Sequence, residues 1–201
     1  MVDATVFVSA ARAFSGLVDG LPPDGWDGPG LGQWDLRALT GHTGRALVTV
    51  STYLRRPAAP LALTSPEAYY TATAAAANSD PGAVAERGRM AGAALGDDPA
   101  AAVRSLVVAA VADVNRADDP VIETIAGGMR LSDYLPTRVF ELAVHSLDIA
   151  AATGAVYAPP DDVLRQALAL AGRIAIVRGD GAVALRALTG RHGLPGDFSV
   201  V

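Results

Sequence analysis

The spacing of apolar residues constrains the fold of this chain more than any other feature. Apolar side chains recur three and four residues apart in about five segments, which is the period of an α-helix with one buried face. Glycine, proline and aspartate residues separate these segments. The pattern predicts an all-α protein.

The segments also predict where the helices begin and end. Helices are expected at residues 3–18, 35–54, 66–77, 81–116, 133–152 and 161–177, with a break near 96–99. Residues 121–125 are rich in β-branched side chains, and two glycines and residues 129–131 follow, which predicts a short hairpin or extended connection. The tail from residue 182 begins with a helical pattern and ends irregularly.

Polar residues and one proline mark the expected helix starts. Asp35 is the expected N-cap of the second helix, and Asp161 or Asp162 is that of the last. Ser132 or Asp133 is expected to open the helix that runs to residue 152. Its proline, at position 136, then falls in the first turn, where proline is best tolerated.

The chain length favours a single domain. The 201 residues are 51% hydrophobic and 18% charged, which suffices for one sizeable core. No internal repeat of about 20 to 50 residues divides the chain. We expect one helical domain over residues 1–201, with a bundle core over 3–178 and a tail over 179–201.

Two residue types are missing, and their absence excludes several kinds of chemistry. The chain has no Cys, which excludes disulfides, a thiolate nucleophile and Cys-ligated metal, so that any metal must be bound by His, Asp or Glu. All 16 basic residues are Arg, because no Lys occurs in the sequence. The chain therefore has no lysine for a Schiff base or a Walker A motif.

Charge and hydropathy argue against nucleic acid and membranes as partners. The net charge is −5 and the arginines are scattered, which argues against nucleic acid as a ligand. No stretch approaches the roughly 20 apolar residues that cross a bilayer. Asp3 and Arg12 interrupt the N-terminal segment, unlike a secretory signal. We expect a cytoplasmic protein that binds neither nucleic acid nor membrane.

One expected helix, at residues 136–152, carries a narrow polar stripe. The stripe consists of Arg138, Glu141, His145 and Asp148. At about 100° per residue, these side chains fall within an arc of about 80°. Apolar residues occupy nearly all of the remaining circumference. This pattern predicts a buried helix whose polar stripe faces other polar groups inside the protein.

Two interpretations of the stripe remain open. In the first, its residues form a buried ladder of ion pairs and hydrogen bonds. In the second, Glu141 and His145, one turn apart, are two ligands of a divalent metal, and the third comes from another helix. His42 is the candidate because it lies mid-helix beside an apolar stripe, where an imidazole without a partner is unfavourable. The alternative for His42 is a hydrogen-bonded core histidine.

The other aromatic residues and the last histidine suggest no site of their own. His192 lies in a glycine-rich segment, which predicts an exposed loop residue. Trp26 and Trp34 are expected to anchor the loop by packing. Tyr53, Tyr69 and Tyr70 could line a pocket that the sequence does not locate.

Two motifs, taken together, resemble those of a known family. Trp34 is followed after seven residues by His42, within W-D-L-R-A-L-T-G-H, and the stripe on the later helix has the form R-x-x-E-x-x-x-H-x-x-D. In this order they resemble the two motifs of the mycothiol-dependent maleylpyruvate isomerase family, within the DinB-like superfamily. The resemblance covers roughly residues 5–155.

The resemblance implies a fold and a metal site. The fold would be a DinB-like up-and-down four-helix bundle with additional short helices. His42, Glu141 and His145 would hold a divalent metal, zinc in the founding activity, with nickel or another ion as alternatives. Three mixed nitrogen and oxygen ligands with open positions are typical of a catalytic metal. Arg138 and Asp148 would orient Glu141 and His145.

The resemblance also implies a reaction. In this family the thiol mycothiol supplies the sulfur, and the metal would lower the pKa of that thiol. The expected function is a thiol S-transferase or thiol-assisted isomerase that acts on a small electrophile, as a monomer or a homodimer. The full-length isomerase has a further C-terminal domain that contributes to its active site, so the resemblance does not extend to maleylpyruvate as the substrate.

Two other function classes remain as alternatives. The first is a non-catalytic metal- or ligand-binding helical bundle, which would bind metal without turning over a thiol. The second is a helical ligand-sensing regulator. The acidic net charge and the lack of a basic helix-turn-helix argue against the regulator.

Overall fold

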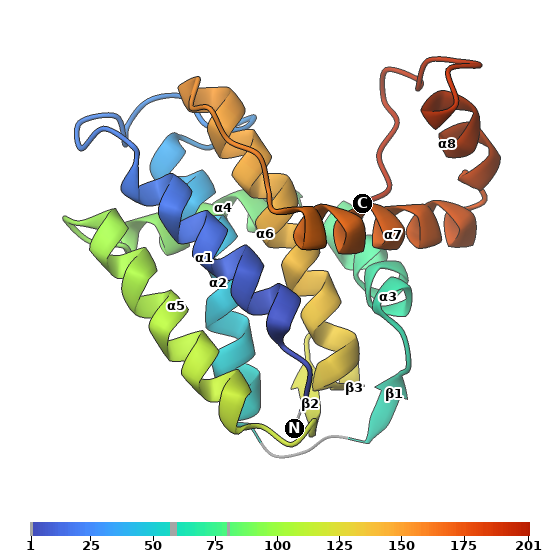
Figure 1. Ribbon diagram of the computed structural model, residues 1–201, viewed down its shortest axis with the longest axis horizontal. Helices are drawn as coiled ribbons and strands as arrows, with labels where there is room; N and C mark the ends of the chain where they lie inside the picture. The colour runs from blue at the N-terminus through green and yellow to red at the C-terminus, as the bar shows by residue number, and fades with distance from the viewer. Residues whose placement is uncertain (1, 57–59, 80) are drawn as a thin grey trace.

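The computed structural model describes residues 2–56, 60–79 and 81–201. Its helices are α1 (Thr5–Asp19), α2 (Leu36–Leu54), α3 (Pro66–Ser79), α4 (Pro81–Ala93), α5 (Pro99–Arg116), α6 (Leu131–Thr153), α7 (Asp161–Arg178) and α8 (Gly181–Leu188). The strands are β1 (Leu61–Leu63), β2 (Val121–Thr124) and β3 (Gly127–Arg130). The expected all-α class is confirmed, with one small sheet added (Figure 1).

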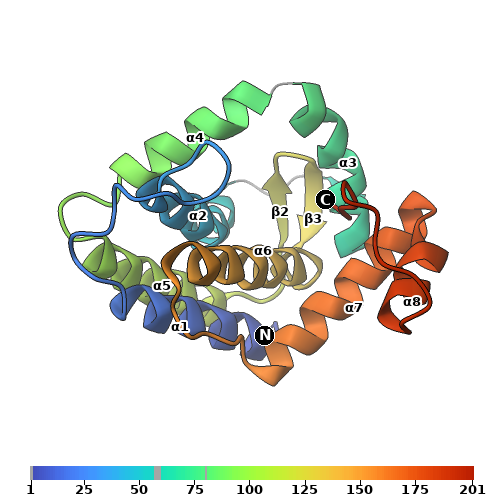
Figure 2. The same cartoon turned by 90° about the horizontal axis from the view of Figure 1, so that it is seen from above.

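Four helices, α1, α2, α5 and α6, form a bundle (Figure 2). Around the bundle, α1 contacts α5, α5 contacts α2, α2 contacts α6, and α6 contacts α1. Their apolar faces meet in one core, whose largest fully buried side chains include Phe7, Phe14, Leu39, Leu47, Tyr134, Leu142 and Ile149. The helical spacing of apolar residues creates these faces, and the DinB-like four-helix fold follows from their burial.

Polar contacts at the two ends of the bundle define the helix directions. Arg37, at the start of α2, donates a hydrogen bond to the carbonyl of Gly96, just before α5. Arg55, just after α2, pairs with Asp113 near the end of α5. These two helices therefore run in the same direction, and α1 and α6 run in the opposite one (Figure 1). Successive helices run in opposite directions, as expected of an up-and-down bundle, from α1 to α2 and from α5 to α6. Between these pairs, α3 and α4 carry the chain back.

The helix α4 lies on α2, where two glycines permit a close approach. A Cβ atom on Gly41 of α2 would collide with the backbone of Gly92 in α4. A Cβ atom on Gly92 would lie 2.8 Å from the backbone of Ala38. Only glycine fits where two backbones approach so closely. Since Gly41 precedes His42, this contact holds α4 against the part of α2 that carries the histidine.

The hairpin expected at residues 121–131 is confirmed. The strands β2 and β3 pair antiparallel, with Ile122 opposite Met129, and both side chains are buried. The strand β1 pairs parallel to β3, which gives the order β1-β3-β2. The sequence did not predict β1, because three residues are too few to show an alternating pattern.

Two of the expected helix starts differ in their outcome. Asp35 caps α2 as expected, since its side chain accepts a hydrogen bond of 2.7 Å from a backbone amide of the first turn. The helix α6 begins earlier than expected, at Leu131, because Asp119 accepts hydrogen bonds from the amide and the hydroxyl of Ser132. Pro136 consequently lies in the second turn of α6 and not in the first.

The prediction that Asp161 or Asp162 caps α7 is wrong. Pro160 occupies the cap position, both aspartates belong to the first turn, and no side-chain hydrogen bond caps this helix. Asp162 instead accepts a hydrogen bond of 3.1 Å from Ser9 of α1. The two carboxylates still favour the helix, because they lie at the positive end of its dipole.

The C-terminal part of the structure is more exposed than the bundle. The helix α8 lies where the tail was expected to begin with a helix, and it has no buried residue. Irregular chain follows it to residue 201, as expected. Within the described residues, no helix is long and apolar enough to cross a membrane.

Candidate metal centre

Two helices bring three metal-ligating residues together inside the bundle. His42 comes from α2, and Glu141 and His145 come from successive turns of α6. One ligand atom of each residue lies within 4.8 Å of the other two. The rings of His42 and His145 are nearly perpendicular, with centroids 5.0 Å apart. The three residues that the sequence singled out as ligands are therefore neighbours in space.

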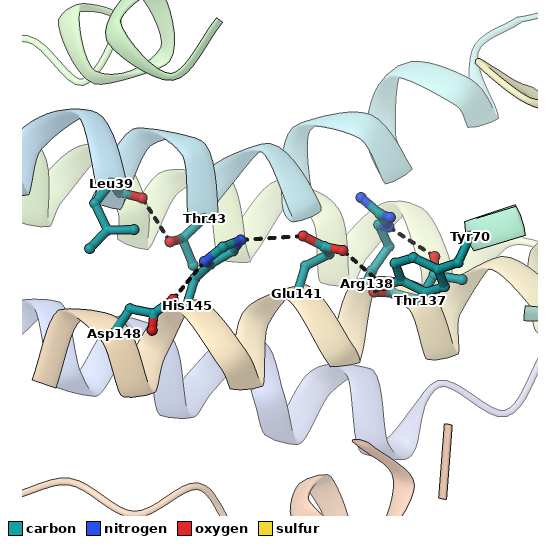
Figure 3. A network of polar contacts seen from close by, with 8 residues as sticks. All are labelled: Leu39, Thr43, Tyr70, Thr137, Arg138, Glu141, His145 and Asp148. Carbon is teal, nitrogen blue, oxygen red and sulfur yellow. Dashed lines mark hydrogen bonds and ion pairs between the residues drawn. The ribbon is translucent and has the colours of Figure 1, made fainter. Parts of the chain in front are cut away.

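A chain of polar contacts holds the α6 side of this triad (Figure 3). Oε2 of Glu141 lies 3.4 Å from Nε2 of His145, and Nδ1 of His145 lies 3.0 Å from Oδ2 of Asp148. Tyr70 of α3 donates a hydrogen bond of 2.8 Å to Oε1 of Glu141 and lies 3.2 Å from the carbonyl of Thr137. Each oxygen of Glu141 thus has a different neighbour, and Asp148 lies beside His145, where it was expected.

These contacts determine the charges on α6. Burial by itself would raise the pKa of Glu141, but the hydrogen bond with His145 and the charge of Arg138 lower it to about 2. Burial would lower the pKa of His145, but its contacts with Asp148 and Glu141 raise it to about 9. At neutral pH, the metal-free protein therefore holds a protonated His145 between two carboxylates.

The α2 side of the triad has a different environment. The ring of His42 packs against that of Trp34, with centroids 4.4 Å apart, and Nε1 of Trp34 donates a hydrogen bond of 2.9 Å to the carbonyl of Ala85 in α4. Burial, and then the charge of His145, lower the pKa of His42 to about 4. At neutral pH His42 is a neutral imidazole, the form that binds metal.

The triad has the donors that a divalent cation requires. Two imidazoles and one carboxylate are a common ligand set for zinc and related ions, and three ligands leave positions open for other molecules. Nδ1 of His42 is buried without a hydrogen-bond partner among the described residues. A buried imidazole with an unpaired nitrogen is unfavourable on its own. The residues present therefore fit a bound metal ion.

Arg138 does not make the expected contact with Glu141. Its Nε donates a hydrogen bond of 3.0 Å to the hydroxyl of Thr137, and its guanidinium lies 5.3 and 4.7 Å from the ring centres of Tyr69 and Tyr134. In the described part of the chain, no carboxylate forms an ion pair with it. It acts on Glu141 only through its charge.

A cavity of about 170 Å³ lies beside the triad, with His42 and Glu141 in its wall. Three arginines also line it, namely Arg45 of α2, Arg87 of α4 and Arg138 of α6. The remaining polar lining consists of hydroxyl groups from Thr49, Tyr53, Tyr69, Tyr70 and Thr73. The cavity therefore combines the candidate metal ligands with an excess of positive charge.

Two of these arginines, Arg45 and Arg87, were not predicted from the sequence, and neither was the position of the tyrosines. Arg45 follows His42 by three residues, so helical spacing places both on one face of α2 and could have indicated it. Arg87 and Tyr70 reach the cavity from α4 and α3, whose packing no local pattern reveals. His192 is exposed in the loop after α8, as expected.

The family comparison agrees with this geometry. The family model described as the mycothiol maleylpyruvate isomerase N-terminal domain matches residues 7–150, which is more than half of the chain. The chain belongs to this family. The match confirms the resemblance that the two motifs predicted, and this mycothiol maleylpyruvate isomerase domain includes all three residues of the triad. Comparison with curated proteins and with solved structures gave no match.

Proposed function

We propose that this protein is a metal-dependent enzyme that uses a low-molecular-weight thiol, mycothiol or a similar one. The reaction would be transfer of the thiol to a small electrophile, or thiol-assisted isomerisation of that electrophile. The observation that carries the proposal is the meeting of His42, Glu141 and His145 within 4.8 Å in the wall of a cavity. Zinc is the expected ion, and nickel or another divalent ion also suits these donors.

The bound metal would stabilise the thiol as a thiolate and polarise the electrophile. Because the chain has no Cys, the sulfur must come from the thiol substrate. Asp148 would keep its contact with Nδ1 of His145, which leaves Nε2 available as a ligand atom. Tyr70 would likewise hold Oε1 of Glu141 and leave Oε2 available.

The arginines favour an electrophile with a carboxylate group. Arg138 is only 8% exposed, and no described carboxylate pairs with it, with Arg45 or with Arg87. A guanidinium binds a carboxylate through two parallel hydrogen bonds. A substrate carboxylate in the cavity would thus neutralise positive charge that the protein leaves unpaired. It would also fix the orientation of the electrophile beside the triad.

Metal content is the first test. Protein purified without an affinity tag would be examined by elemental analysis as wild type, as Glu141→Gln and as Glu123→Gln, a matched control in the exposed part of β2. We expect about one ion per chain in the wild type and in the control, and loss of the ion in Glu141→Gln. No metal in any of them, even after reconstitution, would leave the polar stripe as an ion-pair ladder and reject the proposal.

Thiol turnover is the second test, and it separates the enzyme from a non-catalytic bundle. The metal-loaded wild type would be incubated with mycothiol and a panel of small electrophilic carboxylates, and free thiol would be followed with time. Consumption of thiol, or isomerisation that requires it, supports the enzyme. Full metal occupancy without either reaction would favour the metal- or ligand-binding module.

The location and the assembly of the protein are part of the same proposal. A thiol-dependent enzyme requires the reducing conditions of the cytoplasm, where low-molecular-weight thiols stay reduced. A monomer and a homodimer are both compatible with a site built within one chain, since all three triad residues come from that chain. Light scattering on the metal-loaded protein would distinguish them.

A further inference from the structure

A second cavity adjoins the first at the hydrogen bond between Tyr70 and Glu141. Its volume is about 490 Å³, and it lies between α3, α4, α7 and the residues at the C-terminal end of the chain. Figure 2 shows this end of the chain close to α3 and α7. Four residues, Tyr70, Thr73, Val84 and Glu141, line both cavities. A molecule that extends from one cavity into the other therefore passes beside Glu141.

The two cavities differ in chemistry. Three arginines and five hydroxyl-bearing residues line the first. Most of the lining of the second is aliphatic, from Ala74, Val84, Ile174, Val177, Val200 and Val201. Thr71 and Arg178 add polar groups, besides the shared Tyr70, Thr73 and Glu141. Val177 and Val201 keep 56% and 57% of their surface exposed. Its volume lies within the range of about 300–1,000 Å³ that is typical of small-molecule sites. The second cavity thus suits an apolar group of a ligand.

We propose that the electrophile accepted by this site is an amphipathic carboxylate with an alkyl or aryl group. The carboxylate lies among Arg45, Arg87 and Arg138 in the first cavity, and the apolar group lies in the second. This inference rests on the proposed function, because it assigns the substrate class of the same site. A polar thiol in the second cavity would place most of its hydroxyl and amide groups against aliphatic side chains, where they find few hydrogen-bond partners. The apolar part of the electrophile is therefore the occupant.

The test uses straight-chain carboxylates from acetate to octanoate as probes. Their affinities for the metal-loaded wild type would be measured by calorimetry at constant pH and salt concentration. Each methylene that enters an apolar cavity is expected to raise the affinity about fourfold. The increase should begin only with chains long enough to reach past Glu141.

Two variants on one helix locate the apolar group. Val177→Trp would fill the second cavity, so it should flatten the rise with chain length and leave acetate binding unchanged. Leu168→Trp is the matched control, because Leu168 is also on α7, is 63% exposed and does not line this cavity. Arg45→Ala should weaken all the carboxylates by a similar factor and keep the dependence on chain length.

Some outcomes would overturn the inference. Equal affinities across the series in the wild type would exclude an apolar subsite, as would the same chain-length dependence in Val177→Trp and Leu168→Trp. The series would also be measured with Glu141→Gln. If the protein neither binds metal nor turns over a thiol, and the affinity still rises with chain length, the apolar subsite is supported and the proposed enzymatic function is rejected. Thiol turnover with a flat series supports the enzyme and rejects the apolar subsite.

Discussion

The α2 side and the α6 side of the candidate metal centre differ in charge. The α6 side contains Glu141, His145 and Asp148, which contact one another and keep His145 protonated in the metal-free protein. The α2 side contains His42, which packs on the ring of Trp34 and is neutral at neutral pH. One helix therefore brings its own countercharges, whereas the other brings a neutral donor that depends on the bundle for its position.

The largest expected effect is the decrease in metal affinity when a ligand is removed, and it should be the same for a ligand on α2 and one on α6. If the roughly 10–16 kcal/mol of a structural zinc site is shared among four ligands, each supplies about 3 kcal/mol, or about 200-fold in affinity. We expect this loss for His42→Leu and for His145→Leu, measured by competition with a chelator. His192→Leu, at the exposed third histidine, should bind metal as the wild type does. Wild-type metal affinity in His42→Leu would show that α2 contributes no ligand to the metal centre.

Asp148 and Trp34, which contact the ligand histidines, should differ in their effect on metal affinity. Asp148→Asn should weaken metal binding about 10- to 100-fold, because a carboxylate that contacts a ligand histidine orients it and raises its basicity. Trp34→Leu should have a smaller effect, since Trp34 packs on His42 without a hydrogen bond to it. Calorimetric titration of zinc into both variants measures this difference. Equal losses of metal affinity would show that packing against a ligand histidine matters as much as a charged neighbour does.

In the metal-free protein, substitutions of the two histidines should differ in their effect on the free energy of unfolding. His145→Leu leaves Glu141 and Asp148 without their shared cation, and we expect a loss of about 1–2 kcal/mol in the free energy of unfolding. His42→Leu removes a buried nitrogen that has no partner, so it should change the free energy of unfolding by less than about 1 kcal/mol. Urea denaturation with a chelator present measures both. A larger loss for His42→Leu would contradict the charge difference between the sides.

The two sides should also differ in pH dependence. The pKa of His145 is raised from 6.5 to about 9, so its contribution to stability is complete below pH 6.5 and is lost as the pH rises to 9. The pKa of His42 is lowered from 6.5 to about 4, so its contribution is present above pH 6.5 and is lost as the pH falls to 4. The Tm of the metal-free protein, measured from pH 4 to 10, should decline on both sides of a maximum.

The histidine variants assign the two slopes. His145→Leu should remove most of the decline above pH 6.5 and make the acid-side decline smaller, because the charge of His145 helps to lower the pKa of His42. His42→Leu should reduce the decline between pH 6.5 and 4 and leave the alkaline side unchanged. If His42→Leu altered the alkaline slope, the charges assigned to the two sides would be wrong.

Local patterns predicted most of α6. The spacing of Glu141, His145 and Asp148 places them on one face of any helix, so their mutual contacts need no information from elsewhere in the chain. The contact expected between Arg138 and Glu141 followed the same logic and does not form. The guanidinium lies over Tyr69 and Tyr134 instead, and the ring of Tyr69 comes from a different helix.

Sequence by itself determined the helices, the cap at Asp35, the hairpin and the polar stripe, because each depends on residues close together in the chain. Tertiary structure alone decided the parallel course of α2 and α5, the contact of Tyr70 with Glu141 and the position of an apolar cavity beside a charged one. These features arise where helices far apart in the sequence pack together. Their side chains become neighbours only because burial of the apolar faces fixes how the helices dock.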